Sequence, residues 1–97
     1  MDRFDTLPPT PFPTADRPLA GLTVLLVEDS RLASEGMRLL CARSGARLRR
    51  ADTLGAAERH LRAYRPGAVI VDLHLPDGSG LDLFRSLARA RPRIPAI

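Results

Sequence analysis

The stretch "VIVDLHLPDGSGLDLF", residues 69–84, decides the fold, because an apolar run of the buried type ends in a bare aspartate, Asp72. A desolvated carboxylate is costly unless a nearby group compensates it. Pro76, Gly78 and Gly80 follow closely, and these residue types let a backbone turn sharply. The stretch therefore predicts a buried strand that ends in an acid beside a tight loop, and the rest of the chain has to supply the compensating group.

Three further stretches have the pattern of strands. Residues 22–27, "LTVLLV", form a continuous β-rich apolar run that is typical of a strand covered on both faces. Residues 46–51, "ARLRRA", alternate apolar and polar side chains, as expected near a sheet edge. Residues 94–97, "IPAI", resemble the opening of another strand.

Segments of helical period separate these strands. The first is predicted to begin after an N-cap at Ser30 and to end at Gly45. Its apolar stripe consists of Leu32, Gly36, Leu39 and Leu40. The second begins after Asp52 or Thr53 and ends before a Pro-Gly pair, and the third covers residues 81–90. The resulting order, β-α-β-α-β-α-β with short connections, predicts an α/β fold with a parallel sheet and helices on both faces.

Composition narrows the class of protein. The chain has 97 residues, a net charge of +4 and 44% hydrophobic residues, which suits one small globular domain. Its fifteen basic residues are all arginines, mostly scattered at helical spacing, and few aromatics accompany them. We therefore expect no direct binding of nucleic acid. One cysteine, Cys41, excludes an internal disulfide, and no run is long enough to span a membrane, so the expected location is cytoplasmic.

The first twenty residues differ from the remainder. Five of the nine prolines lie in residues 1–20, so this segment is predicted to be extended and disordered. The folded domain is predicted to cover residues 21–97.

Two predicted strands end in acids. Glu28 and Asp29 follow the first strand, and Asp72 follows the third. Ligands of open parallel sheets bind beyond the carboxyl ends of the strands, so neighbouring strands would bring the three carboxylates together. Their repulsion calls for a cation, and an all-oxygen ligand set suits Mg²⁺ better than zinc. A carboxylate beside such a cation can also attack a phosphoryl group.

The alternative interpretation is that the three acids are unrelated strand-end caps. Asp77 is interpreted as part of the turn, and the side chain of His74 as an exposed loop group. Three other phosphate or metal motifs are excluded, because a residue that each motif requires is missing from the sequence. A haloacid-dehalogenase-type site would need an acid at position 74, an EF-hand loop would need one at position 73, and a Walker-type loop needs a lysine, of which the chain has none.

The stretches "LLVEDSRL", "VIVDLHLPDGSGLDLF" and "IPAI" together resemble a response-regulator receiver domain of two-component signalling systems. The resemblance covers residues 22–97 and implies a flavodoxin-like (CheY-like) α/β/α fold. By this resemblance Asp72 is the phosphoacceptor and Asp29 a direct Mg²⁺ ligand. Glu28 holds the ion mainly through water, and the backbone carbonyl of His74 supplies a further ligand. The implied donor is a phosphohistidine on a sensor histidine kinase or a histidine phosphotransfer protein. The resemblance also implies that the domain is a signalling phosphoacceptor in a phosphorelay rather than an enzyme.

The chain departs from the family pattern after Ile97. Receiver domains continue with a hydroxyl residue after the fourth strand and a lysine after the fifth, and both lie beyond the family pattern present here. The fold is therefore expected to be incomplete at its C-terminus. Apolar surface is expected to be exposed on the first helix and on the "IPAI" edge. One rival hypothesis is an impaired receiver that acts as an interaction module, in a homodimer or with a partner chain that completes the sheet. Another is that the segment does not fold stably alone.

Overall fold

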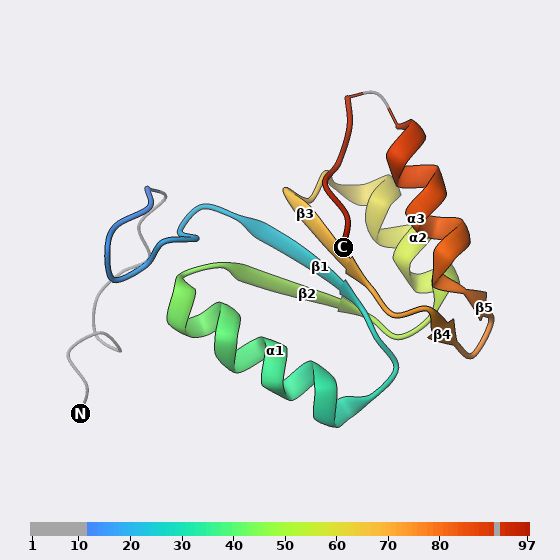
Figure 1. The fold of residues 1–97 in the computed structure, drawn as a ribbon, viewed down its shortest axis with the longest axis horizontal. Coiled ribbons are helices and arrows are strands. Elements are labelled where there is room, and N and C mark those ends of the chain that lie inside the picture. Colours follow the sequence, from blue (N-terminus) through green and yellow to red (C-terminus); the bar gives the residue numbers. More distant parts are fainter. Residues whose placement is uncertain (1–11, 91) are drawn as a thin grey trace.

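The computed structural model describes residues 12–90 and 92–97, which form one sheet flanked by helices and one short hairpin (Figure 1). The elements in chain order are β1 (Thr23–Val27), α1 (Arg31–Ser44), β2 (Arg47–Ala51), α2 (Leu54–Ala63), β3 (Ala68–Val71), β4 (His74–Leu75), β5 (Gly78–Ser79) and α3 (Gly80–Arg89). The predicted alternation of strands and helices is confirmed. The β4–β5 hairpin was not predicted, and it occupies the stretch interpreted as a plain turn.

Strand β1 lies at the centre of the sheet. It pairs in parallel with β2 on one side and with β3 on the other, in the order β2-β1-β3. Residues 95–97 then run parallel to β3. The Val69 N–H donates to the Pro95 carbonyl and the Ile97 N–H donates to the Val69 carbonyl, both at 2.9 Å. The expectation that "IPAI" opens another strand is therefore confirmed by main-chain hydrogen bonds.

One face of the sheet is covered by α2 and α3, which lie together on one side of the strands in Figure 1. Leu25 and Val27 of β1 and Val69 of β3 are fully buried there, against Ala57 of α2 and Leu87 of α3. Successive side chains of a strand point to opposite faces, so alternate residues of β1 serve this core. This is the larger of the two apolar layers, and it supports the strands that carry the acids.

Among the helices of the described residues, α1 is the one that covers the opposite face. Ser34 and Cys41 are the buried residues of this helix, whereas the predicted stripe is turned away from the sheet. The exposed fractions are 86% at Leu32, 48% at Leu39 and 57% at Leu40. The expected exposure of apolar surface on the first helix is therefore observed, and small side chains rather than leucines pack against the strands.

The ends of the helices follow local rules. The Ser30 hydroxyl accepts the Ala33 N–H and caps α1, which ends at Gly45 with a φ of 87°. A side chain at position 45 would also meet Arg17 Cβ at 2.9 Å, so glycine is required twice over. Of the two candidate caps for α2, Thr53 is the one used, with its hydroxyl accepting the Ala56 N–H at 3.0 Å.

The segment that precedes β1 packs against the end of α1. The Leu19 N–H donates to the Ser44 carbonyl at 2.8 Å, and Ala20 is buried. Residues 1–11 lie outside the described residues. They contain three of the five prolines on which the prediction of disorder was based. Within the described part of the chain, no helix is long and apolar enough to cross a membrane.

Candidate functional site

Three carboxylates meet at the carboxyl end of the sheet. Glu28 and Asp29 follow β1, Asp72 follows β3, and one carboxylate oxygen of each lies within 4.8 Å of the others. Glu28 and Asp72 are half-buried and Asp29 is exposed. The parallel pairing of β1 with β3 produces this arrangement, because it brings the carboxyl ends of both strands to the same edge.

Main-chain hydrogen bonds fix the positions of these acids. The Glu28 N–H donates to the Ala51 carbonyl and the Asp72 N–H donates to the Val27 carbonyl, both at 2.9 Å. Each bond extends a strand ladder by one residue beyond the regular strand. The backbone that carries Glu28 and Asp72 is therefore held by the same hydrogen-bond ladders as the sheet.

The carboxylates are only partly satisfied by the protein. Glu28 Oε1 accepts the Ser30 N–H at 3.0 Å, and Asp72 Oδ1 accepts the His74 N–H at 3.3 Å. No ion pair between described residues involves any of the three acids. An ionised carboxylate has two oxygens and about four acceptor sites, so acceptor capacity remains at each group. Three uncompensated negative charges with free oxygens suit a hard divalent cation such as Mg²⁺.

Arg50 supports the loop that carries the acidic pair, a role the sequence analysis missed. Its Nε donates to the Glu28 carbonyl and its Nη2 to the Asp29 carbonyl, each at 3.1 Å. Arg50 lies near the end of β2, the neighbour of β1, so it faces the residues that follow β1. The sequence signal was an arginine at the end of an edge strand, which in sequence looks like any other surface charge of this arginine-rich chain.

Asp77 links the loop after β3 to helix α2. Its Oδ1 accepts the Leu54 N–H at 2.8 Å and its Oδ2 accepts the Gly55 N–H at 3.0 Å. These hydrogen bonds, that from Leu54 first, lower the pKa of the Asp77 carboxyl from its usual value of 3.8. The interpretation of Asp77 as turn chemistry was incomplete, because its side chain caps a helix that begins more than twenty residues earlier.

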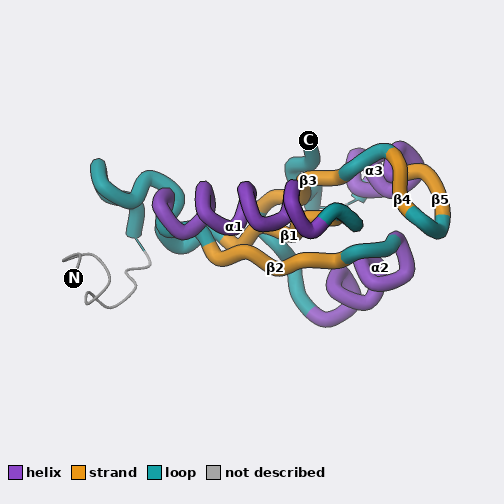
Figure 2. The backbone as a smooth tube through the Cα atoms, turned by 90° about the horizontal axis from the view of Figure 1, so that it is seen from below, coloured by secondary structure: helices purple, strands orange, loops and turns teal. Residues whose placement is uncertain are grey.

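The glycines of the loop are required by close approach. A Cβ at Gly80 would lie 1.9 Å from the Asp72 carbonyl oxygen, and one at Gly78 would lie 2.9 Å from Leu54 Cδ1. Gly78 also has a φ of 149°, which other residues rarely adopt. Figure 2 shows the β4–β5 hairpin beyond the end of β3, next to the start of α3. The proline and glycines noted in the sequence therefore let α3 begin directly against the strand end that bears Asp72.

His74 lies in β4, and its side chain is exposed, as expected. Its N–H is directed to Asp72, which holds its peptide beside the acidic cluster.

Comparisons with known proteins agree with this geometry. Residues 24–97 match the family described as response regulator receiver domain. The chain is 39% identical over 85 residues to the aerobic respiration control sensor protein ArcB of Escherichia coli (strain K12), covering 84% of this chain and 10% of ArcB. It is 32% identical over 76 residues to the probable transcriptional regulatory protein TcrX of Mycobacterium tuberculosis, covering 78% of this chain and 32% of TcrX. The chain thus spans a minor part of both relatives.

A solved structure gives the same fold. The non-phosphorylated HemR receiver domain from Leptospira biflexa superposes with a TM-score of 0.65 at 32% identity, covering 77% of this chain and 60% of that chain. The predicted CheY-like, flavodoxin-like architecture is confirmed by this likeness. The family match takes in most of the sequence, and the parallel sheet carries acids at the edge where this fold binds ligands. The chain belongs to the response regulator receiver domains of two-component signalling systems.

Proposed function

We propose that this domain accepts a phosphoryl group on Asp72 with Mg²⁺ bound among Glu28, Asp29 and Asp72. The observation that carries the proposal is the meeting of these three carboxylates within 4.8 Å at the ends of β1 and β3. Asp29 and Asp72 are the direct ligands, and Glu28 acts mainly through water. The His74 carbonyl is the further ligand, since its peptide is already held against Asp72.

Asp72 is the best nucleophile of the three for structural reasons. Its Oδ1 accepts the His74 N–H, which orients the carboxylate and leaves Oδ2 free to attack. Glu28 accepts the Ser30 N–H through Oε1, but its side chain is one methylene longer and has more rotatable bonds than that of Asp72. Asp29 is exposed to solvent. Asp72 combines this short, oriented side chain with partial burial and a ladder bond to Val27. Positioning of this kind is the main contribution that a protein makes to phosphoryl transfer.

The proposed chemistry is a displacement at phosphorus. Asp72 Oδ2 forms the new P–O bond while the P–N bond to a phosphohistidine imidazole breaks, and the imidazole leaves with the bonding electron pair. Mg²⁺ held by these carboxylates would neutralise the negative charge on the phosphoryl oxygens. Gly80 keeps the space beside the Asp72 backbone free of a side chain, so the start of α3 lies against the strand end. The product is an aspartyl phosphate.

The proposed donor is a phosphohistidine on a sensor histidine kinase or on a histidine phosphotransfer protein. The relatives support this partner class, because one is named a sensor protein and another a transcriptional regulatory protein.

A second candidate function is an interaction module that extends its sheet. Residues 95–97 add to β3 by main-chain hydrogen bonds, and Ile97 is 80% exposed. A second copy or another strand would add to this edge by the same main-chain pairing. Light scattering with the purified chain tests pairing with a second copy: a concentration-dependent dimer supports it, and a monomer at all concentrations rejects it.

Binding of beryllofluoride tests the leading proposal. In the presence of Mg²⁺, fluorine NMR of the wild-type protein is expected to report a bound phosphoryl analogue, and Asp72→Asn is expected to abolish that signal. Asp82→Asn is the matched control, because Asp82 is an exposed acid in the first turn of α3. An undiminished signal in Asp72→Asn would rule out Asp72 as the acceptor.

A further inference from the structure

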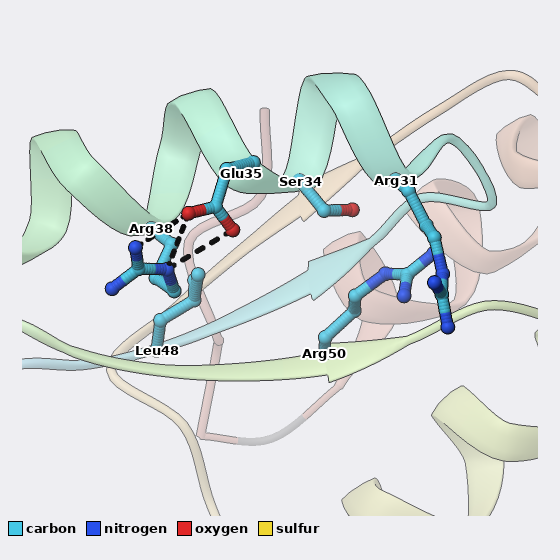
Figure 3. Close-up of a pocket in the computed structure, with 6 residues that line it drawn as sticks. All are labelled: Arg31, Ser34, Glu35, Arg38, Leu48 and Arg50. Carbon is cyan, nitrogen blue, oxygen red and sulfur yellow. Dashed lines mark hydrogen bonds and ion pairs between the residues drawn. The ribbon is translucent and has the colours of Figure 1, made fainter.

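A cavity outside the acidic cluster lies between α1 and β2, on the face of the sheet opposite α2 and α3 (Figure 3). Its volume is about 440 Å³, and it is lined by Arg31, Ser34, Glu35, Arg38, Leu48 and Arg50. We refer to it as the α1–β2 pocket. None of the three acids of the phosphoacceptor site lines it.

The pocket is strongly basic. Three of its six lining residues are arginines, and Glu35 is the one acid among them. Glu35 is paired with Arg38, whose Nε donates to both of its carboxylate oxygens at 3.0 and 3.1 Å. No ion pair between described residues involves Arg31 or Arg50, so their positive charges are not neutralised within this part of the chain. A positively charged cavity attracts anions and concentrates them locally.

The arginines keep unused donors. Arg38 binds Glu35 through Nε and Nη2, and Arg50 binds the β1–α1 loop through Nε and Nη2. No hydrogen bond between residues that the structure describes uses Nη1 of either arginine. The Arg31 side chain makes no hydrogen bond within the described part of the chain, and Figure 3 shows it beside Arg50. A guanidinium has five N–H donors in a planar fork, which matches the oxygens of phosphate and carboxylate groups.

Ser34 is an independent indication of a ligand. The residue is only 7% exposed, and its Oγ is buried without a hydrogen-bond partner among described residues. In Figure 3 the hydroxyl projects from α1 into the pocket, toward Arg31 and Arg50. A buried hydroxyl without a partner costs free energy, so an unsatisfied group of this kind calls for a bound molecule that completes it.

We propose that the α1–β2 pocket binds a compact polyvalent oxyanion, of the class of pyrophosphate or a small phosphorylated metabolite. Arg31 and Arg50 hold the anion from the two walls, Arg38 adds its free Nη1, and the Ser34 hydroxyl donates to an anion oxygen. Leu48 forms the apolar part of the wall. The site is separate from the acidic cluster, which repels anions unless a cation is present.

Titration with inorganic pyrophosphate tests this proposal. The full chain is titrated by calorimetry in a metal-free buffer containing EDTA and moderate salt, so that the acidic cluster has no cation to attract the probe. We expect one anion per chain. Arg31→Gln and Ser34→Ala are each expected to weaken binding, the arginine variant by about tenfold because it loses charge-assisted hydrogen bonds.

The control is Arg62→Gln, which removes the same charge from an exposed position of α2 outside the pocket. It is expected to leave the affinity unchanged. Equal weakening by Arg62→Gln and Arg31→Gln, or no saturable binding to the wild type, would overturn the proposal, since either result means non-specific attraction only.

The two sites are distinguished by Asp72→Asn. If the pocket is the binding site, this variant retains pyrophosphate affinity in EDTA although it loses phosphoryl acceptance. Loss of pyrophosphate binding in Asp72→Asn would place the anion at the acidic cluster and reject the pocket. Failure of the phosphoacceptor proposal, by contrast, would leave the Arg31 and Ser34 results unchanged.

Discussion

The carboxylate of Asp77 accepts the backbone N–H of Leu54 at 2.8 Å, so the loop after β3 is fastened to the first turn of α2. A second bond from the Gly55 N–H makes the contact bidentate. The cap satisfies donors that every helix N-terminus leaves free, and its negative charge suits the helix dipole. One side chain therefore joins the loop that follows Asp72 to a helix on the same face of the sheet.

Asp77→Ala is expected to lower the midpoint of thermal unfolding, because it leaves the Leu54 and Gly55 donors without this acceptor. The effect depends on pH. The folded-state pKa of Asp77 lies below its usual 3.8, so the stabilisation is fully present above about 3.8 and is lost as pH falls through the lower folded value. Thermal melts at neutral and acidic pH check this. A difference between wild type and Asp77→Ala that persists below the folded pKa would contradict it.

Gly80→Ala is expected to destabilise the fold severely, by about 3 kcal/mol, because the added Cβ meets the Asp72 carbonyl oxygen at 1.9 Å. Gly36→Ala is the matched control. Gly36 lies in α1 with nothing within 4 Å of its added Cβ, so alanine is expected to stabilise the chain by about 0.5–1 kcal/mol. Urea denaturation measures both. Equal effects of the two substitutions would mean that the loop does not pack as described.

Mg²⁺ is expected to raise the thermal midpoint of the wild type, since binding removes repulsion among the three acids. At a hundredfold excess over the dissociation constant the stabilisation is about 2.7 kcal/mol. Asp29→Asn is expected to melt higher than wild type in EDTA and to gain less from Mg²⁺. If the wild type melts at the same temperature in EDTA and in saturating Mg²⁺, the cluster is not a metal site.

Arg50→Gln is expected to weaken Mg²⁺ binding by about tenfold, because the Glu28 and Asp29 carbonyls lose the guanidinium that holds their loop. Arg47→Gln, an exposed substitution at the other end of β2, is expected to leave metal affinity unchanged. Calorimetric titration with Mg²⁺ compares the two. Removing a positive charge near the site could by itself strengthen cation binding. A higher Mg²⁺ affinity of Arg50→Gln would therefore show that Arg50 does not position the metal-binding loop.

The predictable features of this domain are those that depend on neighbouring residues. The apolar runs before Glu28 and Asp72 define strands by themselves, and a parallel sheet then brings their acidic ends together. Ser30 and Gly45 likewise mark the ends of α1 through local hydrogen bonds. The strands and the helix ends can be inferred from residue type and spacing alone, whereas the meeting of the acids also requires β1 and β3 to be neighbours, as they are in the structure.

The features that escaped the sequence analysis depend on tertiary contacts. Arg50 and Asp77 bond to backbone groups more than twenty residues away, and no local pattern distinguishes them from other surface charges. The outward orientation of the α1 leucines was expected only through the family resemblance, and not from the periodicity of the helix itself. Its leucines give the stronger periodic signal, yet the close approach of α1 to the sheet selects the smaller side chains of Ser34 and Cys41.

The most direct test of the account is to locate the phosphoryl group after incubation with acetyl phosphate and Mg²⁺. Reduction of the acyl phosphate with borohydride and tandem mass spectrometry of the peptides identify the modified residue. The account predicts modification at Asp72, none at Glu28 or Asp29, and none in Asp72→Asn. Modification at another acid, or an unmodified wild type under conditions in which Mg²⁺ binds, would contradict it.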